Sequence, residues 1–269
     1  MPELAEVEYY RRRWDAGLGA RVLSVKLHAQ RRVFREVDTR ALEEAAGGAT
    51  FLESQAHGKW MLFHFTRRRR HAWVGVHLGM TGELRCENAN FQPGRHDHLV
   101  LVQEKRALVF HDPRQFGRIT FDQGTTAPGW WTDLPAAIAS RAFTPEAVEK
   151  VLRRRQRSPI KAVLLMQDAF PGIGNWMADE VLWRTRIHPS TRAGEVVHQA
   201  GRLWTELRWV TREALRIVSK DFSEPPESWL FRHRWRPGGK CPRDGTELRR
   251  ATVGGRTTAW CSNCQSTKK

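Results

Sequence analysis

The sequence predicts an α+β protein of several domains: an N-terminal β-sandwich with a flanking helix, then a helical domain, then a small cysteine-bearing hairpin. Three observations predict this order. Short runs with strand-like alternation fill the first 125 or so residues, helical periodicity follows a Gly/Pro/Thr-rich stretch, and three of the four cysteines fall in the last 30 residues. A chain of 269 residues is long enough to bury two moderate cores. We therefore place the domains at residues 1–125, 144–226 and 227–269, with residues 126–143 as a linker.

The N-terminal domain is expected to hold one helix followed by many short strands. Residues 6–16 have the pattern of a helix, and the strand-like runs are residues 22–27, 60–65, 72–77, 98–102 and 107–111. Gly, Pro, Asn or charged turns separate these runs, which is typical of a sandwich. Four consecutive arginines, residues 67–70, lie between two of the strands. We interpret them as a hairpin tip, and a solvated turn is favoured there over a specific DNA contact.

The helical domain begins after the linker. Thr144 is a predicted N-cap, and Pro145 follows in the first turn. Helices are expected at residues 146–153, 160–167, 176–185 and 196–220, and two prolines at 225 and 226 end this part of the chain.

The charge of the chain indicates a polyanionic partner. Lys and Arg number 45 against 29 Asp and Glu, which gives a net charge of +16, and there are 12 tryptophans. An arginine-rich surplus with many aromatic rings favours nucleic acid. An anionic membrane surface is disfavoured, because no segment approaches 20 apolar residues and the basic clusters do not follow one amphipathic helix. Ribosome association or plain solubility remain as ordinary explanations of the charge.

The opening residues suggest chemistry at the N-terminus. If Met1 is removed, Pro2 carries a free secondary amine with a pKa near ~8, so that part of it is neutral at physiological pH. Such an amine attacks an aldehyde carbon to form an iminium ion, and Glu3 and Glu6 are close enough in sequence to move protons around it. The ordinary alternative is that proline in this position merely aids removal of Met1. The opening segment has no apolar h-region, so we expect no secretory signal and a location in the cytoplasm or nucleoid.

Two further patterns indicate binding sites. Residues 170–180 join two helices through a glycine-flanked turn, which would aim unpaired backbone N–H groups and Asn175 at a phosphate in front of a helix N-terminus. The C-terminal cysteines have the spacing C-x2-D-x16-C-x2-C, which predicts one structural Zn²⁺ held by Cys241, Cys261 and Cys264 with Asp244 as the fourth ligand. Cys86 is expected to be a small buried hydrophobe.

Seven motifs now occur in one order along almost the whole chain, from residue 2 to residue 265. They are Pro2-Glu3 with Glu6, Gly58-Lys59, His77-Leu78-Gly79-Met80-Thr81-Gly82, His96-Asp97-His98, Asp112-Pro113-Arg114-Gln115-Phe116-Gly117, Gly172-Ile173-Gly174-Asn175 and the cysteine hairpin. Together they resemble the formamidopyrimidine-DNA glycosylase / endonuclease VIII family. The resemblance implies a helix–two-turn–helix fold for the helical domain and a zinc-finger hairpin after it, with damaged double-stranded DNA as the partner of a monomeric enzyme.

The resemblance also implies roles for individual residues. Pro2 matches the nucleophile that attacks C1′ of the damaged nucleotide, Glu3 the group that protonates the sugar, and Lys59 a proton donor and phosphate contact. Arg256 matches the hairpin arginine that contacts phosphate and assists δ-elimination. The remaining matches are residues that fill the DNA stack after the nucleotide is extruded, namely Met80, Arg114 and Phe116, and residues that contact the backbone, namely His96, Lys161 and Asn175.

The expected function is therefore that of a bifunctional glycosylase and AP lyase acting on oxidised bases by β,δ-elimination. Two alternatives stay open: the same scaffold acting on oxidised pyrimidines, abasic sites or bulky adducts, and a DNA-binding protein that has lost catalysis. Asp244 stands where the family pattern has a second cysteine. In addition, residues 220–240 are short, proline-stiffened and aromatic, whereas members specialised for 8-oxoguanine carry a long glycine-rich loop there. Trp229, Phe231 and Trp235 could stack on a base, but packing against the zinc unit is favoured.

Overall fold

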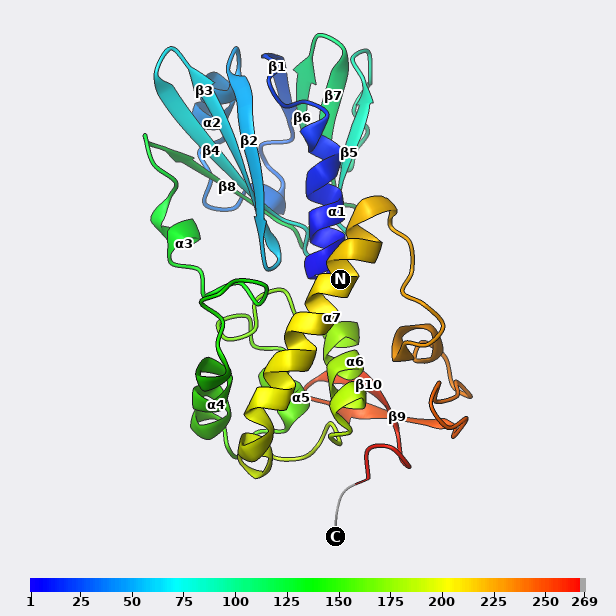
Figure 1. Ribbon diagram of the computed structural model, residues 1–269. Coiled ribbons are helices and arrows are strands. Elements are labelled where there is room, and N and C mark those ends of the chain that lie inside the picture. The colour runs from blue at the N-terminus through cyan, green and yellow to red at the C-terminus, as the bar shows by residue number, and fades with distance from the viewer. Residues whose placement is uncertain (267–269) are drawn as a thin grey trace. The chain divides into compact units, whose positions relative to one another are not determined.

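The computed structural model describes residues 1–266 and confirms the predicted fold class: a β-sandwich, a helical domain with its two-turn motif, and a C-terminal hairpin bearing the cysteine cluster (Figure 1). The chain divides by its contacts into two compact units. The first holds residues 1–2 and 6–134, and the second holds residues 3–5 and 135 onward. The boundary at 134/135 lies inside the predicted linker, part of which forms the short helix α3 (Gly129–Thr132).

The first unit contains two four-stranded sheets, and all paired strands are antiparallel. One sheet has the order β1 (Val22–Leu27), β6 (Asp97–Gln103), β7 (Arg106–His111), β5 (Glu83–Asn88). The other has the order β2 (Thr50–His57), β3 (Trp60–Arg67), β4 (Arg70–His77), β8 (Arg118–Gln123). The unit is completed by helix α2 (Thr39–Ala46), by the 3₁₀ turn η1 (Arg32–Phe34) and by helix α1 (Leu4–Asp15) from residue 6 onward.

A single apolar core joins the two sheets. Alternate residues of each strand point inward, so that Phe63 and Phe65 of β3 meet Leu99 and Phe110 of the other sheet in one buried cluster. Trp14 of α1 is also fully buried there, with its ring centroid 4.6 Å from that of Phe63. Because burial of one such side chain stabilises the fold by about 2–3 kcal/mol, this core holds the strand ends, and the turns between them, in fixed positions.

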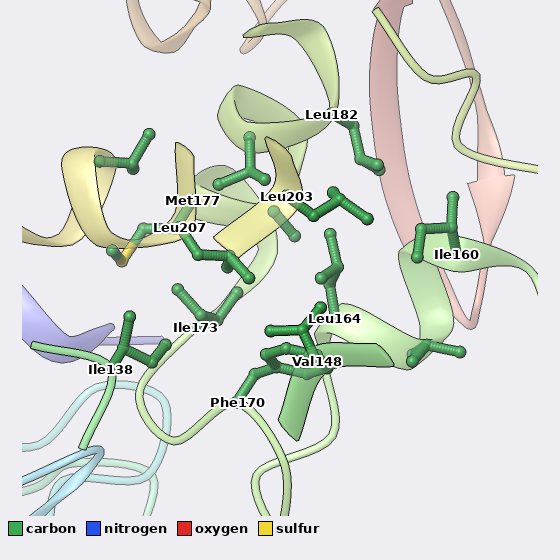
Figure 2. Close-up of a cluster of buried hydrophobic side chains, with 14 of the residues drawn as sticks. Ile138, Val148, Ile160, Leu164, Phe170, Ile173, Met177, Leu182, Leu203 and Leu207 are labelled. Carbon is green, nitrogen blue, oxygen red and sulfur yellow. The ribbon is translucent and has the colours of Figure 1, made fainter. Parts of the chain in front are cut away.

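The second unit is mainly helical. It contains α4 (Pro145–Arg154), α5 (Ile160–Leu164), α6 (Asn175–Thr185), α7 (Ala200–Asp221), two 3₁₀ segments, η2 (Ala193–Gln199) and η3 (Leu230–His233), and a hairpin of β9 (Leu248–Val253) and β10 (Arg256–Cys261). Figure 2 shows its core, in which Val148, Phe170, Leu182 and Leu203 from different segments point toward one another. Helix α6 is almost wholly buried, so its N-terminus is held rigidly.

Two helix predictions are wrong in their limits. The helix expected at residues 160–167 ends at Leu164, because the side chain of Gln167 forms the next turn instead: it donates to Leu165 O and Ile173 O and accepts from Gly172 N. The helix expected from residue 196 begins as the 3₁₀ segment η2 and becomes α-helical only at Ala200. The predicted cap is confirmed, since Thr144 Oγ1 accepts from Ala147 N at 3.3 Å.

The aromatic residues after α7 pack differently from the prediction. Trp229 belongs to the helical core, with its ring 5.2 Å from that of Trp209 and 6.4 Å from that of Trp176. Phe231 packs edge-on against Trp176 at 5.1 Å. It is Leu230 that joins the cluster around the cysteines. The aromatic rings therefore stabilise the helices, and only Trp235 of these residues is largely exposed.

Among residues 1–266, no helix combines the length and the apolar character that crossing a membrane would require.

Candidate functional site

Four of the predicted site residues of the first unit, Lys59, Met80, Arg114 and Phe116, gather at one end of the β2-β3-β4-β8 sheet. The register pairs Trp60 of β3 with His77 of β4, and His77 with Arg118 of β8. Lys59 directly precedes Trp60, the loop carrying Met80 directly follows His77, and the turn carrying Arg114 and Phe116 directly precedes Arg118. Three loops that are distant in sequence therefore emerge side by side, and we call them the loop end of the sheet.

Two of these loops are in direct backbone contact. Gly79 has a φ of +63°, and a Cβ placed on it would lie 2.3 Å from the carbonyl carbon of Phe116 and 2.5 Å from Gly117 N. Only glycine fits such an approach and such a φ. The fully buried carboxylate of Asp112 supports the same contact, since it accepts from Gly117 N at 2.7 Å and from Thr81 Oγ1 at 3.0 Å.

Two side chains on these loops, Arg114 and Phe116, are exposed, as the predicted insertion into DNA would require. Phe116 is 42% exposed, although large apolar side chains are usually buried. The guanidinium carbon of Arg114 lies 4.7 Å from the centre of the Phe116 ring, so a planar cation and an aromatic ring form one projecting pair. Met80 is half-buried. His96 lies before β6, with its ring 5.9 Å from that of His111.

Lys59 and His77 are neighbouring basic residues at the loop end, and they differ in charge: Lys59 is positive and His77 is neutral. Lys59 is half-buried in the two-residue turn between β2 and β3, where Gly58 has a φ of +60°. Burial, with smaller contributions from the positive charges of Lys59 and Arg35, lowers the pKa of His77 to about 4. His77 Nδ1 accepts from Gly79 N at 3.0 Å. His77 is therefore a neutral acceptor at physiological pH, a feature that sequence reasoning missed although His77 stood inside a quoted motif.

In the second unit, the carboxylate of Glu3 caps helix α6. It accepts from Gly174 N at 3.0 Å, Trp176 N at 2.8 Å and Met177 N at 3.1 Å, and the Glu3 residue is only 3% exposed. A negative charge against three N–H groups at the positive end of a helix is strongly favoured. The predicted phosphate site with unpaired N–H donors is thus wrong for these three donors, because residue 3 of the same chain already occupies them.

Gly174 is the position on which this cap depends, since a Cβ there would lie 2.3 Å from Glu3 Cδ. We expect Gly174→Ala to displace the carboxylate and to lower the free energy of unfolding by about 2–4 kcal/mol, the cost of losing hydrogen bonds to a charged acceptor. Chemical denaturation measures it. Gly201→Ala is the matched control, because nothing lies within 4 Å of a Cβ there and the residue is in helix α7; equal losses in both variants would contradict the cap.

Lys161 lies in the interior, not at a surface. Its ammonium donates to Asn175 O at 2.6 Å and to Asp179 Oδ1 at 2.5 Å, and the residue is 0% exposed. Burial lowers the pKa of Lys161. Asp179 also accepts from the Arg234 guanidinium at 2.6 and 3.0 Å and from Ala259 N at 3.2 Å. The predicted direct contact of Lys161 with a DNA backbone is therefore not available in this structure; Lys161 instead holds the turn at Asn175.

Asn175 and Arg256 lie on the two segments that this buried network joins. Asn175 Nδ2 donates to Thr257 O of strand β10 at 2.8 Å. Arg256 follows the turn formed by Gly254 and Gly255, which have φ values of +60° and +72°. A Cβ on Gly254 would lie 2.9 Å from the Cβ of Ala162 in α5, so the hairpin tip packs closely on that helix and presents the exposed Arg256 beside it.

The C-terminal hairpin brings four potential metal ligands together. The ligand atoms of Cys241, Asp244, Cys261 and Cys264 all lie within 4.8 Å of one another. A tetrahedral Zn²⁺ with Zn–S bonds of about 2.3 Å separates two sulfurs by about 3.8 Å, and the Cys241 and Cys264 sulfurs are 3.8 Å apart. Asp244 oxygens lie 3.3 Å from Cys264 Sγ and 3.6 Å from Cys261 Sγ. These residues fit the geometry of a zinc site.

Neighbouring groups orient the ligands. Trp183 Nε1 donates to Cys241 Sγ at 3.4 Å, and Asn263 Nδ2 donates to Asp244 Oδ2 at 2.9 Å. Hydrogen bonds, first from Thr246 N and then from Asn263, lower the pKa of Asp244, so its carboxylate is ionised and able to bind a cation. Such orienting groups commonly contribute 10–100-fold to metal affinity.

We expect Asp244→Ala to weaken zinc binding by at least ~10-fold and Asp244→Cys to preserve it, because thiolate is a preferred zinc ligand. Metal content measured by emission spectroscopy after dialysis against increasing chelator separates the two variants. If Asp244→Ala retained zinc as well as the parent chain, Asp244 would not be the fourth ligand.

Comparison with known proteins gives consistent matches over the chain. The family model of the formamidopyrimidine-DNA glycosylase N-terminal domain matches residues 1–119, and that of the formamidopyrimidine-DNA glycosylase H2TH domain matches residues 135–223. A formamidopyrimidine-DNA glycosylase from Bordetella pertussis is 34% identical, over 98% of this chain and 99% of that protein. One from Thermus thermophilus is also 34% identical, over 98% of both chains.

Solved structures share the fold. A mutant of the Lactococcus lactis FPG in complex with a Fapy-dG-containing DNA has a TM-score of 0.86 at 25% identity, covering 99% of this chain and 100% of that one. MutM in complex with carbocyclic 8-oxo-G-containing DNA has a TM-score of 0.87 at 24% identity with the same coverage. The latter likeness establishes the fold only.

Proposed function

Since the chain belongs to the formamidopyrimidine-DNA glycosylase family, we propose that it is a base-excision-repair DNA glycosylase that removes oxidised bases from double-stranded DNA and then cuts the strand as an AP lyase. It acts as a monomer whose nucleophile is the amine of Pro2. Zn²⁺ in the cysteine cluster supplies structure to the hairpin that carries Arg256, and no step of the reaction passes through it.

The reaction follows from the chemistry of a secondary amine. The Pro2 nitrogen forms a bond to C1′ while the glycosidic bond breaks, and the base leaves with that electron pair and gains a proton. The sugar ring then opens at the C1′–O4′ bond, O4′ takes a proton, and an iminium ion remains at C1′. This cation acidifies the C2′ proton, so its loss expels the 3′ phosphate in β-elimination. Elimination of the 5′ phosphate by δ-elimination follows, and Arg256 is the residue proposed to assist it.

The anchoring of Glu3 is the observation that carries this proposal. Glu3 is covalently joined to Pro2, and its carboxylate is held by three N–H groups at 2.8–3.1 Å. A general acid that must deliver a proton to O4′ has to be held in place, and such groups typically contribute 10²–10⁴-fold to rate. A protein that only bound damaged DNA would need neither an anchored carboxylate after a proline amine nor a lysine at the loop end.

The loop end supports the extrusion of the nucleotide. A base in a duplex cannot be reached by an amine until the nucleotide leaves the stack, and the vacated space must be filled. Met80 is a flexible apolar wedge, and Arg114 with Phe116 is a projecting pair of a planar cation and a ring that suits the orphaned base and its neighbour. Since the Asp112 carboxylate and the Gly79 contact fix both loops, little ordering is needed when DNA binds.

Incubation with duplexes that contain 8-oxoguanine, formamidopyrimidine, thymine glycol or dihydrouracil tests this function. We expect release of a free base together with strand cleavage that leaves phosphate at both sides of a one-nucleotide gap. Base release without strand cleavage would contradict the lyase activity. Cleavage that stops after one elimination would contradict the δ-elimination step. Binding without base release or cleavage would indicate a damage-binding protein. In Glu3→Gln we expect the single-turnover rate to fall on the order of 10²-fold while DNA affinity is kept.

One observation favours a lesion other than 8-oxoguanine. Between the end of α7 at Asp221 and η3 at Leu230, the chain contains two prolines and has no regular structure, and Trp229 is buried in the helical core. A short segment held in this way is poorly suited to fold over an extruded purine. The alternative is therefore the same reaction on oxidised pyrimidines, abasic sites or bulky adducts, and the lesion panel ranks these directly.

A further inference from the structure

The β3–β4 hairpin of the first unit ends in four consecutive arginines, residues 67–70. Arg67 pairs with Arg70 in the register, and the two central residues, Arg68 and Arg69, have φ values of +45° and +66°. A two-residue loop with both φ values positive is a type I′ turn, which strongly prefers Asn-Gly or Gly-Gly. The β9–β10 turn of the same chain uses Gly254 and Gly255 at the corresponding positions. The arginine tip thus places two charged side chains where the backbone disfavours them.

These arginines are not neutralised by ion pairs within the described part of the chain. Among residues 1–266, none of Arg68, Arg69 and Arg70 forms an ion pair, and Arg67 donates to the carbonyl oxygen of Gly47 at 2.9 Å, which is not an ionised group. Many surface arginines elsewhere are paired with a carboxylate, as Arg153 is with Glu149. Adjacent positive charges that are not paired with carboxylates repel one another. An anion that binds among them relieves this repulsion and is attracted by each of the charges.

A cavity of about 520 Å³ opens beside this tip, lined by Arg67, Arg68, Arg70 and His71 together with helix α2. Glu44 also lines it, but its carboxylate pairs with Arg40 at 3.1 Å. Guanidinium groups bind phosphate through planar, paired N–H donors. The cavity therefore has the size and the donors for a sugar-phosphate segment. The tip carries no large apolar residue that would insert into a lipid surface, which disfavours a membrane.

The arginine tip lies at the opposite end of the sheet from the loop end. Strand β3 runs from Trp60, next to Lys59, to Arg67 and has eight residues, which at about 3.3 Å per residue separates the two ends by about 25 Å. Figure 1 shows the β3–β4 turn and the β2–β3 turn at opposite ends of this sheet. A duplex lying across Met80, Arg114 and Phe116 does not require the tip for any part of the proposed reaction.

We propose that the arginine tip is a second nucleic-acid site, which binds the phosphate backbone of a DNA segment other than the one held at the loop end. The proposal takes from the proposed function only that DNA is the partner. An enzyme with two such sites holds one duplex while it samples another, and contacts of this kind carry no sequence preference.

The test uses Arg68→Asn combined with Arg69→Gly, which removes two charges and gives the type I′ turn its preferred residues. The full-length protein is mixed with a fluorescent, undamaged 12-base-pair duplex at 50 mM salt, and sedimentation reports how many duplexes each protein binds. We expect two duplexes for the parent chain and one for the variant. We expect the Tm to rise by a few degrees, which shows that the fold is kept.

A matched control removes two other exposed arginines, Arg153→Gln with Arg216→Gln, whose side chains are each 67% exposed and paired with a glutamate. This control is expected to keep the second duplex. The proposal is overturned if the parent chain binds only one duplex, if the tip variant still binds two, or if the control loses the second duplex equally. Two further results would overturn the proposal. One is a variant whose only defect is weaker binding of a single, longer duplex. The other is displacement of the fluorescent duplex from the parent chain by anionic vesicles but not by unlabelled DNA. Loss of the first duplex as well in the tip variant, with its Tm kept, would also overturn the proposal, because the tip would then serve the duplex held at the loop end. A parent chain that binds no duplex would instead count against the proposed function.

Discussion

A chain that keeps one uncleaved residue ahead of Pro2 is expected to form no covalent adduct with abasic-site DNA in the presence of borohydride. The nitrogen of Pro2 is then an amide, which has no lone pair available for attack, so both iminium formation and strand cleavage should fall by three orders of magnitude or more, comparable to loss of a catalytic nucleophile. Trapping followed by gel electrophoresis measures the adduct, and peptide mapping of the parent adduct identifies the attached residue.

The matched control keeps a free amine at the N-terminus but changes it from a secondary to a primary amine. Pro2→Gly leaves a free primary amine after Met1 is removed, so some trapping should persist, with slower base release. DNA affinity should be unchanged in both variants, since the loop end is intact. An adduct of normal yield in the extended chain, or one that maps to Lys59, would move the nucleophile away from Pro2.

Asp179→Ala is expected to give the largest loss of stability. It leaves the ammonium of Lys161, which is 0% exposed, and the Arg234 guanidinium, which is 4% exposed as a side chain, without their shared carboxylate. Removing one partner of a buried ionic network costs about 3–5 kcal/mol, or a fall in Tm of roughly 6–20 °C. Asp168→Ala is the control, because Asp168 is exposed and its nearest cation is 3.9 Å away.

The pH dependence of this loss has a definite sign. Burial lowers the pKa of Lys161 in the folded protein below its unfolded value, and removing Asp179 deletes the group that opposes this shift. Between the folded pKa and the unfolded value near ~10.4, the unfolded chain binds more protons, so stability rises with pH. The deficit of Asp179→Ala should therefore shrink as pH is raised from 7 toward 10. A deficit that stayed constant in denaturation at both pH values would mean that Lys161 keeps its charge by another contact.

The sequence predicted central strands well and most edge strands poorly. Strands β3, β4, β6 and β7 are central, and all were expected from their apolar alternation. Strands β2, β5 and β8 were missed, and each is an edge strand in its sheet. In β5, Leu84 is the only buried residue, and β2 buries only Phe51. Because an edge strand gains most of its stability from backbone pairing with one neighbour, its side chains carry little pattern to detect.

The sequence predicted which residues form the candidate site, but it did not predict the hydrogen bonds and the burial of their side chains. The motifs named Glu3 and Lys161, yet nothing in a single sequence indicates that the Glu3 carboxylate caps a helix 171–174 residues away or that Lys161 is buried. Such contacts depend on tertiary folding. The candidate metal ligands were different, because two turns with fixed spacing determine which side chains can meet, and all four predicted ligands gather. Asp38, which caps α2 at 2.9 Å, was a local signal that was overlooked.

The capping of α6 by Glu3 has a consequence for the order in which the protein matures on the ribosome. Residues 3–5 belong to the second unit, so its framework needs these residues together with residues that are synthesised more than 170 positions later. Closing so long a loop is a slow, late event. The cap of helix α6 therefore remains unformed through most of translation, and a fragment that begins at residue 135 would lack the cap of its own central helix.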